Sequence, residues 1–445
     1  MSRPLKRLYE PDAYGVEADR GNYWHTTISS ARDWPTLEGP AQTDVAVIGA
    51  GYTGLSAALH MAQAGLDVVV LDAEAPGWGA SGRNGGFVCL GGARASDSQI
   101  CRSHGTTGLE EFKRAQRIAI DLVDSLLEHH RIDADRHSTG EVVVAHRRRD
   151  VEDLSLNADH LATTYGIKPK MIAKEDMAAQ GLVGDGFHGA LHIPIGFAIN
   201  PRKYALGLAE ACKKAGARIF ARSQVCQILA EGGFYRLRLE RVEVRCKRLV
   251  IATNGYSSDN VPDALRGQFL PVQSNIIVTR TLTEAEISDG WNSDIMAYDT
   301  RNLLHYFRLL PERRFLFGMR GGMRADAAAQ SEMQRAIRTD FETMFPMWAD
   351  VETPYFWSGL ACLSRNLTPY AGPLNDMENA YTAMAYHGNG VAMASYSGML
   401  VAGLLAGKSP KIPAVMQSPM RRYPLPRWRR TFLRPAYEWY GFKDR

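Results

Sequence analysis

The sequence predicts an α/β protein in which a doubly wound parallel sheet is joined to a second, α+β domain built on a mixed, largely antiparallel sheet. Three features of the 445-residue chain support this prediction. A strand, a glycine motif, a helix and another strand follow one another between residues 44 and 72. A buried strand at 248–257 leads back to that unit. Between 267 and 345, apolar and polar residues alternate over short segments, which is typical of antiparallel strands.

The glycine motif predicts a dinucleotide site. Gly49, Gly51 and Gly54 form G-x-G-x-x-G after a short β-branched run, where a buried strand turns into a helix. The first glycine permits the tight turn, the second lets a pyrophosphate approach the backbone, and the third lets the helix pack on its strand. The helix start adds free N–H groups for the phosphates. Asp72 ends the next strand, where it can bind a ribose 2′-OH. These residues predict an adenine dinucleotide and leave FAD and NAD open.

The composition excludes several other functions. The chain has 52 Lys and Arg residues against 48 Asp and Glu residues, which is too even a balance to indicate nucleic-acid binding. The cysteines are scattered, without a C-x-x-C pair or the spacing of zinc ligands, so we expect free thiols in a reducing compartment and no metal site. These six residues are Cys89, Cys101, Cys212, Cys226, Cys246 and Cys362.

Neither the N-terminus nor the longest uncharged segment predicts insertion into a membrane. The N-terminus has no apolar core after its positive charges, so we expect no signal peptide. Residues 390–407 are uncharged and barely long enough to span a bilayer. Because Gly, Ala and Ser make this segment only weakly apolar, we interpret it as a helix buried in a large domain. The sequence therefore predicts a cytoplasmic protein without an integral membrane segment.

The other elements are predicted from periodicity and from helix boundaries. The predicted helices are 109–130, 151–165, 174–181, 202–215 and 330–345, and a last long helix is opened by H-G-N-G-V at 387–391. The predicted strands lie at 140–145, 184–195, 217–228, 235–246, 272–280, 303–310, 314–319, within 355–372, and at 380–386. A glycine-rich loop at 73–88 suggests backbone that passes close to a large flat group.

These elements define the predicted domains. The dinucleotide domain is discontinuous and comprises 44–100, 196–262 and 354–408, whereas the second domain comprises 101–195 and 263–353. Residues 1–43 form an N-terminal arm that precedes them. Residues 409–445 form a basic, aromatic tail, which we interpret as a solvated tail folded on the surface rather than a contact with a membrane or polyanion.

Several motifs together resemble the D-amino acid oxidase (DAO) superfamily of FAD-dependent amine oxidases, and most closely its γ-glutamylputrescine oxidase group. They are D-V-A-V-I-G-A-G-Y-T-G-L-S-A-A-L-H-M-A, G-W-G-A-S-G-R-N-G-G, L-V-I-A-T-N-G-Y, Y-F-R-L and H-G-N-G-V-A. The resemblance extends over about residues 22–407. It implies a Rossmann-like FAD domain and a substrate domain whose sheet covers the flavin, and it favours FAD over NAD.

The resemblance also implies which residues contact FAD, which we expect to be bound noncovalently. They are Gly49, Gly51, Tyr52, Thr53, Gly54, Asp72, Ala73, Gly79, Ala80, Ser81, Arg83, Asn84, Gly85, Gly86, Val225, Thr253, Asn254, Gly255, Gly388, Asn389, Gly390 and Val391. Most relatives have G-H-G-V where this chain has Gly388-Asn389-Gly390-Val391, with His387 just before it. Some relatives tether flavin near Cys362, but a buried structural thiol is the expected role here.

The implied reaction is hydride transfer from a carbon bonded to an uncharged amine to FAD, reoxidation by O2 to give H2O2, and hydrolysis of the imine. We expect Arg308 and Arg320 to bind a substrate carboxylate, with Arg324 as a further candidate. Tyr306 should lie on the same strand face as Arg308, whereas His305 should face the opposite side. The candidate catalytic residues are Tyr306, Arg308, His387 and Asn389.

Three functions remain open from the sequence. The first is an oxidase of a γ-glutamyl polyamine or of a secondary amino acid such as sarcosine or iminodiacetate, with a small-molecule amine and O2 as its partners. The second is a dehydrogenase of the same fold that passes electrons to a quinone or a carrier, with the tail as its membrane dock. The third is a flavin-binding interaction protein without turnover. The sequence leaves the oligomeric state undetermined.

Overall fold

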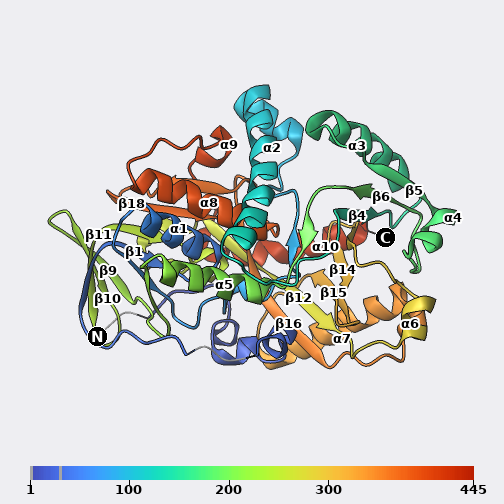
Figure 1. Ribbon diagram of the computed structural model, residues 1–445, viewed down its shortest axis with the longest axis horizontal. Coiled ribbons are helices and arrows are strands. Elements are labelled where there is room, and N and C mark those ends of the chain that lie inside the picture. Colours follow the sequence, from blue (N-terminus) through green and yellow to red (C-terminus); the bar gives the residue numbers. More distant parts are fainter. Residues whose placement is uncertain (1–3, 30–32, 445) are drawn as a thin grey trace.

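The computed structural model describes residues 4–29 and 33–444, which form two eight-stranded sheets side by side (Figure 1). In the first sheet the strand order is β17-β18-β11-β1-β2-β8, and β10 and β9 continue from β11 as a meander. Its strands are β1 (Ala41–Ile48), β2 (Val68–Leu71), β8 (Arg218–Phe220), β9 (Gln227–Glu231), β10 (Phe234–Arg238), β11 (Glu243–Ile251), β17 (Tyr370–Pro373) and β18 (Ala380–Met384).

Parallel pairing at the centre of this sheet explains its apolar strands. β1 pairs in parallel with both β2 and β11, and β11 pairs in parallel with β18. Strands buried on both faces read as continuous β-branched runs, as Val68–Leu71 does. The helices α1 (Tyr52–Gln63), α5 (Pro201–Lys214) and α8 (Gly390–Leu405) lie together beside the sheet (Figure 1). A Cβ atom at Gly398 would lie 2.3 Å from the Thr53 carbonyl, so glycine is required where α8 meets α1.

The second sheet confirms the mixed, largely antiparallel architecture. Its order is β16-β12-β15-β14-β13-β4-β6-β5, and only the β13–β4 pair among these neighbours is parallel. Its strands are β4 (Glu141–Val144), β5 (Lys170–Ala173), β6 (Gly189–Ile193), β12 (Phe269–Val278), β13 (Met296–Asp299), β14 (His305–Leu309), β15 (Phe315–Arg320) and β16 (Tyr355–Ser364). A two-stranded sheet joins β3 (Phe87–Val88) to β7 (Phe197–Ala198).

Helices and short turns complete the chain. The helices are α2 (Asp97–His129), α3 (Asp150–Tyr165), α4 (Lys174–Met177), α6 (Glu284–Asp289), α7 (Ala327–Met344), α9 (Ala414–Gln417) and α10 (Leu433–Lys443). The 3-10 turns are η1 (Pro11–Ala13), η2 (Val16–Asp19), η3 (Tyr23–Thr27), η4 (Ala80–Gly82), η5 (Ala178–Gln180), η6 (Asn254–Tyr256), η7 (Asp263–Leu265), η8 (Pro346–Trp348) and η9 (Pro426–Phe432). α6 and α7 flank the second sheet (Figure 1), and α7 packs its buried face on an aromatic core that includes Phe307 and Trp348.

The strand pairing corrects two sequence-based expectations. β16 pairs along its whole length with β12, so it belongs to the second sheet although residues 354–408 were assigned to the dinucleotide domain. The chain passes from the second sheet back to the first after β16, because β17 pairs with β18 in the first sheet. The C-terminal segment also differs from a solvated tail, because it folds into η9 and α10, which contact the N-terminal arm at Leu8 and the loop after β13 at Asn302.

Within residues 4–29 and 33–444, no helix is both long enough and apolar enough to cross a membrane. The segment at 390–407 is instead α8, most of whose side chains are buried in the core beside the first sheet.

Candidate active site

One elongated cavity of about 590 Å³ runs from the ends of β1 and β2 to the start of α8 and on to β14 and β15. The predicted cofactor residues converge on it from loops that are far apart in the sequence. Those that line the cavity are Gly49, Gly51, Tyr52, Thr53, Asp72, Ala73, Gly79, Ala80, Ser81, Arg83, Asn84, Gly85, Val225, Thr253, Asn254, Gly388, Asn389, Gly390 and Val391. A volume of this size suits a bound cofactor together with a small substrate.

Three of the predicted cofactor residues, all glycines packed closely against backbone carbonyls, do not line the cavity. A Cβ atom on Gly54 would lie 1.9 Å from the Gly49 carbonyl, and one on Gly255 would lie 2.6 Å from the Leu360 carbonyl. Gly86 has a φ of +76°, and its Cβ would lie 2.0 Å from the Ile199 carbonyl. These glycines shape the surrounding loops, and their contact with FAD stays a prediction.

At the β1–β2 end, Gly49 and Gly51 of the glycine turn line the cavity. Gly49 has a φ of +106°, and its Cβ would lie 2.8 Å from the Ala252 carbonyl. Gly51 faces Ser81, whose hydroxyl accepts a 2.9 Å hydrogen bond from the amide of Tyr52. Asp72 accepts hydrogen bonds from the amides of Ala50 at 2.6 Å and Glu74 at 2.8 Å, while burial raises the pKa of its carboxyl. The carboxylate is therefore held rigidly at the end of β2.

The N-terminal arm contributes residues that sequence reasoning missed. Leu5, Arg7 and Tyr14 line the same end of the cavity. The Arg7 guanidinium lies 4.5 Å from the centre of the Tyr14 ring, and its buried Nε has no hydrogen-bond partner within the described residues. An arginine more than thirty positions before the glycine motif carries no local signal of this role, because only the folding of the arm brings it there.

The glycine-rich loop that follows η4 is held by donors on its far side. The indole N–H groups of Trp24 and Trp357 donate to the carbonyls of Asn84 and Arg83 at 3.0 and 2.8 Å. Arg83 itself donates to the Trp78 carbonyl at 2.8 Å and lies against the Trp78 ring. Since these carbonyls are engaged away from the cavity, the loop has one fixed path along the cavity wall.

Arg308 is the main correction to the predicted substrate site. Its side chain is 1% exposed and does not line the cavity. The guanidinium donates to the carbonyls of Gly85 at 2.9 Å and Ile199 at 2.7 Å, and to Nε2 of His137 at 2.8 Å. Burial lowers the pKa of Arg308 to about 9. Tyr306 does line the cavity, so strand alternation was a sound guide, but the backbone at Gly85 lies between Arg308 and the cavity.

The start of α8 meets the cavity with free backbone donors. Asn389 is the N-cap residue, but its side chain makes no capping bond and donates instead to the Leu90 carbonyl at 2.9 Å. The first amides of α8 therefore keep the unpaired N–H groups and positive dipole of a helix start. His387 lines the cavity and contacts the Ser364 hydroxyl at 3.2 Å. Burial lowers the pKa of His387 to about 4, so its imidazole is neutral at pH 7.

At the opposite end of the cavity from Asp72, the charged groups are cations. Arg320, at the end of β15, lines the cavity together with Arg94 and has no hydrogen bond or ion pair within the described part of the chain. Burial and the nearby Arg94 charge lower the pKa of Arg320 to about 10, so it stays charged at pH 7. Asp72 and Glu74 are the acidic residues among the described lining, and both belong to the dinucleotide end. This end of the cavity therefore has a net positive charge.

Aromatic side chains surround Arg320. Tyr306 lines the cavity, and its hydroxyl lies 2.9 Å from that of Ser274. Tyr437 and Tyr440 come from α10, which the sequence did not connect with the site. Burial raises the pKa values of Tyr306 and Tyr437 to about 12, and in both cases the Arg320 charge partly opposes that rise. Arg324 is exposed and pairs with Asp326 at 2.7 Å, so it does not join this group.

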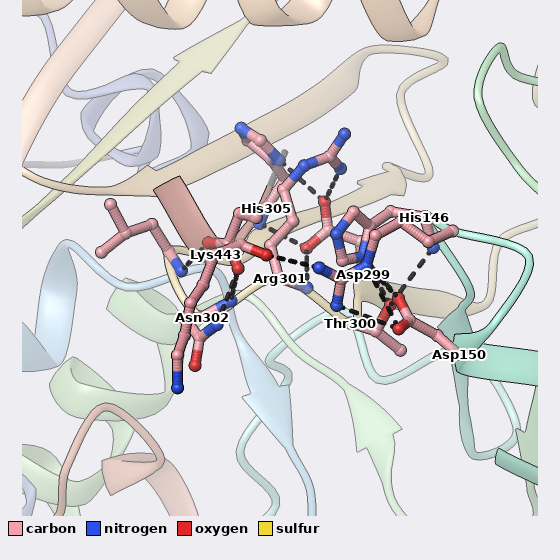
Figure 2. Close-up of polar contacts among 11 residues, drawn as sticks. His146, Asp150, Asp299, Thr300, Arg301, Asn302, His305 and Lys443 are labelled. Carbon is pink, nitrogen blue, oxygen red and sulfur yellow. Dashed lines mark hydrogen bonds and ion pairs between the residues drawn. The ribbon is translucent and has the colours of Figure 1, made fainter. Parts of the chain in front are cut away.

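A polar network joins the end of α10 to the loop after β13, and Figure 2 shows its contacts around Asn302 and Lys443. Asp444, just after α10, accepts hydrogen bonds from the amides of Asn302 and Leu303, both at 2.9 Å. Arg147 donates to the Lys443 carbonyl. Asn302 and Leu303 also line the cavity, so one loop joins the helix to the substrate end.

Ion pairs and hydrogen bonds of Asp299, Thr300 and His305 also hold this loop (Figure 2). Asp299 accepts from Nδ1 of His305 at 2.8 Å, and Nε2 of His305 lies 3.1 Å from Asp340. His305 is outside the cavity lining, as the strand alternation predicted. Thr300 donates to Asp150 at 2.8 Å and contacts His146 at 2.7 Å. The short loop between β13 and β14 is therefore held at both of its ends.

Comparisons with known proteins identify the family. The family described as DAO, FAD dependent oxidoreductase, matches residues 44–404. This chain belongs to the DAO family. It is 29% identical over 427 residues to gamma-glutamylputrescine oxidoreductase of Escherichia coli (strain K12), which spans 95% of this chain and 98% of that protein.

Solved structures of the DAO fold agree with this assignment. Glycine oxidase from Geobacillus kaustophilus superimposes with a TM-score of 0.71 at 18% identity, over 86% of this chain and 100% of that one. Iminodiacetate oxidase from Chelativorans sp. BNC1 superimposes with a TM-score of 0.68 at 18% identity, over 85% and 100%. As a DAO-family member, this chain is an FAD-dependent amine or amino acid oxidoreductase, and the reading as an interaction protein without turnover is set aside.

The cavity fits the FAD that the DAO family binds. Gly49 and Gly51 of the glycine turn line the cavity, and the start of α8 presents unpaired N–H groups, which suit an anionic dinucleotide. The buried, unpartnered Nε of Arg7 adds a donor at the dinucleotide end. Cys362 also lines the cavity, but burial raises the pKa of its thiol to about 12, so it is not a reactive thiolate. Noncovalent binding of FAD therefore stays our prediction.

Proposed function

We propose that this DAO-family protein oxidises the C–N bond of a small amine that carries a carboxylate, with O2 as the electron acceptor. Amine, O2 and water give a carbonyl compound, the released amine or ammonia, and H2O2. The observation that supports the proposal is the half-buried Arg320 beside Arg94, whose guanidinium has no partner among the described residues, at a cavity end where these residues supply no acidic side chain. A charged arginine without a partner is suited to a bidentate contact with a carboxylate.

The proposed position of FAD follows from the two ends of the cavity. The glycine turn at Gly49 and Gly51 would hold the pyrophosphate, Asp72 the ribose, and the start of α8 the pyrimidine end. Bound there, FAD supplies the two-electron acceptor that the amine carbon requires. The positive dipole at Gly390 and Val391 would stabilise negative charge close to that helix start.

The residues around Arg320 suit a neutral amine. The positive charges of the two guanidinium groups disfavour a further positive charge nearby. They therefore lower the pKa of a bound ammonium and promote loss of its proton. The neutral His387 and the high-pKa phenols of Tyr306 and Tyr437 add no negative charge that would oppose this. Their rings instead provide apolar walls for the carbon chain.

Two substrate classes remain candidates for this site. A Cβ atom on Gly388 would lie 2.6 Å from Nη2 of Arg320, so Arg320 is adjacent to the start of α8. This proximity favours a carboxylate near the reacting carbon, as in a secondary amino acid such as sarcosine or iminodiacetate. The likeness to the E. coli gamma-glutamylputrescine oxidoreductase favours a γ-glutamyl polyamine instead.

All six cysteines are free thiols, which supports the proposal of a cytoplasmic location.

An anaerobic absorbance titration of the FAD-loaded protein tests the proposal. The panel pairs each carboxylated amine with a counterpart that lacks the carboxylate: sarcosine with dimethylamine, and γ-glutamylputrescine with putrescine. Bleaching by one carboxylated compound alone, followed by return of colour and release of H2O2 in air, is expected. Bleaching by the counterparts that lack a carboxylate would contradict the carboxylate contact. Bleaching without recovery in air would contradict O2 as acceptor and favour a dehydrogenase.

A further inference from the structure

α10 has two different faces. The side chains of Leu433, Ala436, Tyr437 and Tyr440 recur at the spacing of one helical face and line the cavity. The opposite face carries Trp439 and Phe442, which are 56% and 70% exposed. Their rings lie 6.4 Å apart in a stacked arrangement. The helix therefore presents an aromatic pair to solvent while its other side covers the site.

Exposed apolar side chains are concentrated in this one segment. Of the seven large hydrophobic residues that are exposed among the described residues, five lie between 425 and 442. They are Leu425, Trp428, Phe432, Trp439 and Phe442. The other two, Ile118 and Leu156, stand singly on α2 and α3. Single exposed hydrophobic residues need no explanation, whereas a cluster indicates an interaction surface.

Positive charge accompanies these aromatic residues. Arg421, Arg427 and Lys443 are exposed, and none of them forms an ion pair within the described residues. Nζ of Lys443 lies 5.1 Å from the centre of the Trp439 ring. The one acidic side chain exposed on α10, Glu438, is already paired with Arg434 at 3.1 Å. We call the five apolar residues together with Arg421, Arg427 and Lys443 the aromatic–basic face.

We propose that the aromatic–basic face docks on an anionic lipid surface. Trp and Phe rings insert at the boundary between headgroups and acyl chains, and Lys and Arg side chains next to them bind the lipid phosphates. A second copy of this chain fits less well, because a symmetric contact would place the same unpaired cations against one another. Such docking is peripheral, and it would bring the α10 roof of the cavity next to the membrane.

Vesicle sedimentation of the FAD-loaded full chain tests this proposal without any substrate, so its outcome is independent of the proposed reaction. The vesicles contain phosphatidylcholine with or without phosphatidylglycerol. We expect binding to the anionic vesicles only, weakened by salt, and roughly tenfold or greater loss of binding in Trp439→Ser/Phe442→Ser. The matched control is Leu156→Ser, which removes an equally exposed hydrophobic residue from α3 and should bind as the unmodified protein does.

Three results would overturn the proposal. They are the absence of vesicle binding, binding that the double variant leaves unchanged, and a concentration-dependent dimer that the double variant abolishes. The last result would assign the face to a second copy of the chain. Flavin content and the midpoint of thermal unfolding verify that each variant is folded, and both should be unchanged because the substituted side chains face solvent.

Discussion

Nε of Arg308 donates a 2.9 Å hydrogen bond to the carbonyl of Gly85, in the loop that lines the cavity. The same guanidinium reaches the Ile199 carbonyl, so it joins β14 to the loop and to the short link between β7 and α5. Arg308 thus supports the cavity wall from behind, and the structure gives it no access to a substrate.

Replacing Arg308 should therefore affect folding and flavin retention. Arg308→Met removes the donors and leaves two buried carbonyls unsatisfied, so we expect a loss of about 3 kcal/mol of stability. Denaturant unfolding and the flavin absorbance of the purified protein measure the effect. The hypothesis of direct substrate binding would return if the variant kept its flavin and stability while KM rose for carboxylated amines alone.

Replacing Arg320 should affect catalysis with little effect on stability. Arg320→Met removes the proposed carboxylate contact, so kcat/KM for a carboxylated amine should fall by about 100-fold or more, which corresponds to roughly 3 kcal/mol of transition-state stabilisation. Arg324→Met is the matched control, because Arg324 is exposed and outside the cavity. Equal kcat/KM values for the two variants would exclude Arg320 from substrate binding.

His305 makes stability depend on pH. Burial opposes its charge, but the hydrogen bonds that it donates to Asp299 and Asp340 outweigh that effect and raise the pKa of His305 to about 9. Because this is above the value of about 6.5 in an unfolded chain, the contribution is complete below pH 6.5 and is lost as the pH rises through 9. The shift corresponds to roughly 3 kcal/mol. We expect the unfolding free energy to fall between these pH values.

The variant His305→Gln isolates this effect. It cannot be protonated, so its unfolding free energy should be lower at pH 6.5 and should change less between pH 6.5 and 9.5 than that of the unmodified protein. Denaturant titrations at a series of pH values provide the comparison. Parallel pH profiles for the two proteins would mean that other groups cause the dependence.

Asp444 should control the roof of the cavity. Asp444→Ala removes the acceptor for the amides of Asn302 and Leu303, so α10 loses its attachment to the loop after β13. We expect faster amide hydrogen exchange in 433–443 and a KM several-fold higher, with flavin content retained. Glu438→Ala is the control on the same helix, since its partner Arg434 is exposed. Similar exchange in both variants would show that Asp444 does not hold the helix.

The sequence by itself determined the architecture of the first domain. Gly49, Gly51, Gly54 and the strands around them are local signals, since tight turns and buried parallel strands restrict which residues can occupy each position. Strand alternation likewise placed Tyr306 toward the cavity and His305 away from it, because the pleat has a strict period of two.

The tertiary structure alone decided how distant segments share the site. Arg7 and Tyr437 reach the cavity from opposite ends of the chain, and no periodicity within either segment indicates where it packs. Arg308 and Arg320 are both arginines at the substrate sheet, yet backbone carbonyls satisfy the first, while the guanidinium of the second has no partner among residues 4–29 and 33–444. A sequence pattern specifies only the face of the sheet on which a side chain lies. The roles of the two arginines differ because the folding of the whole chain determines which hydrogen-bond partners each one meets.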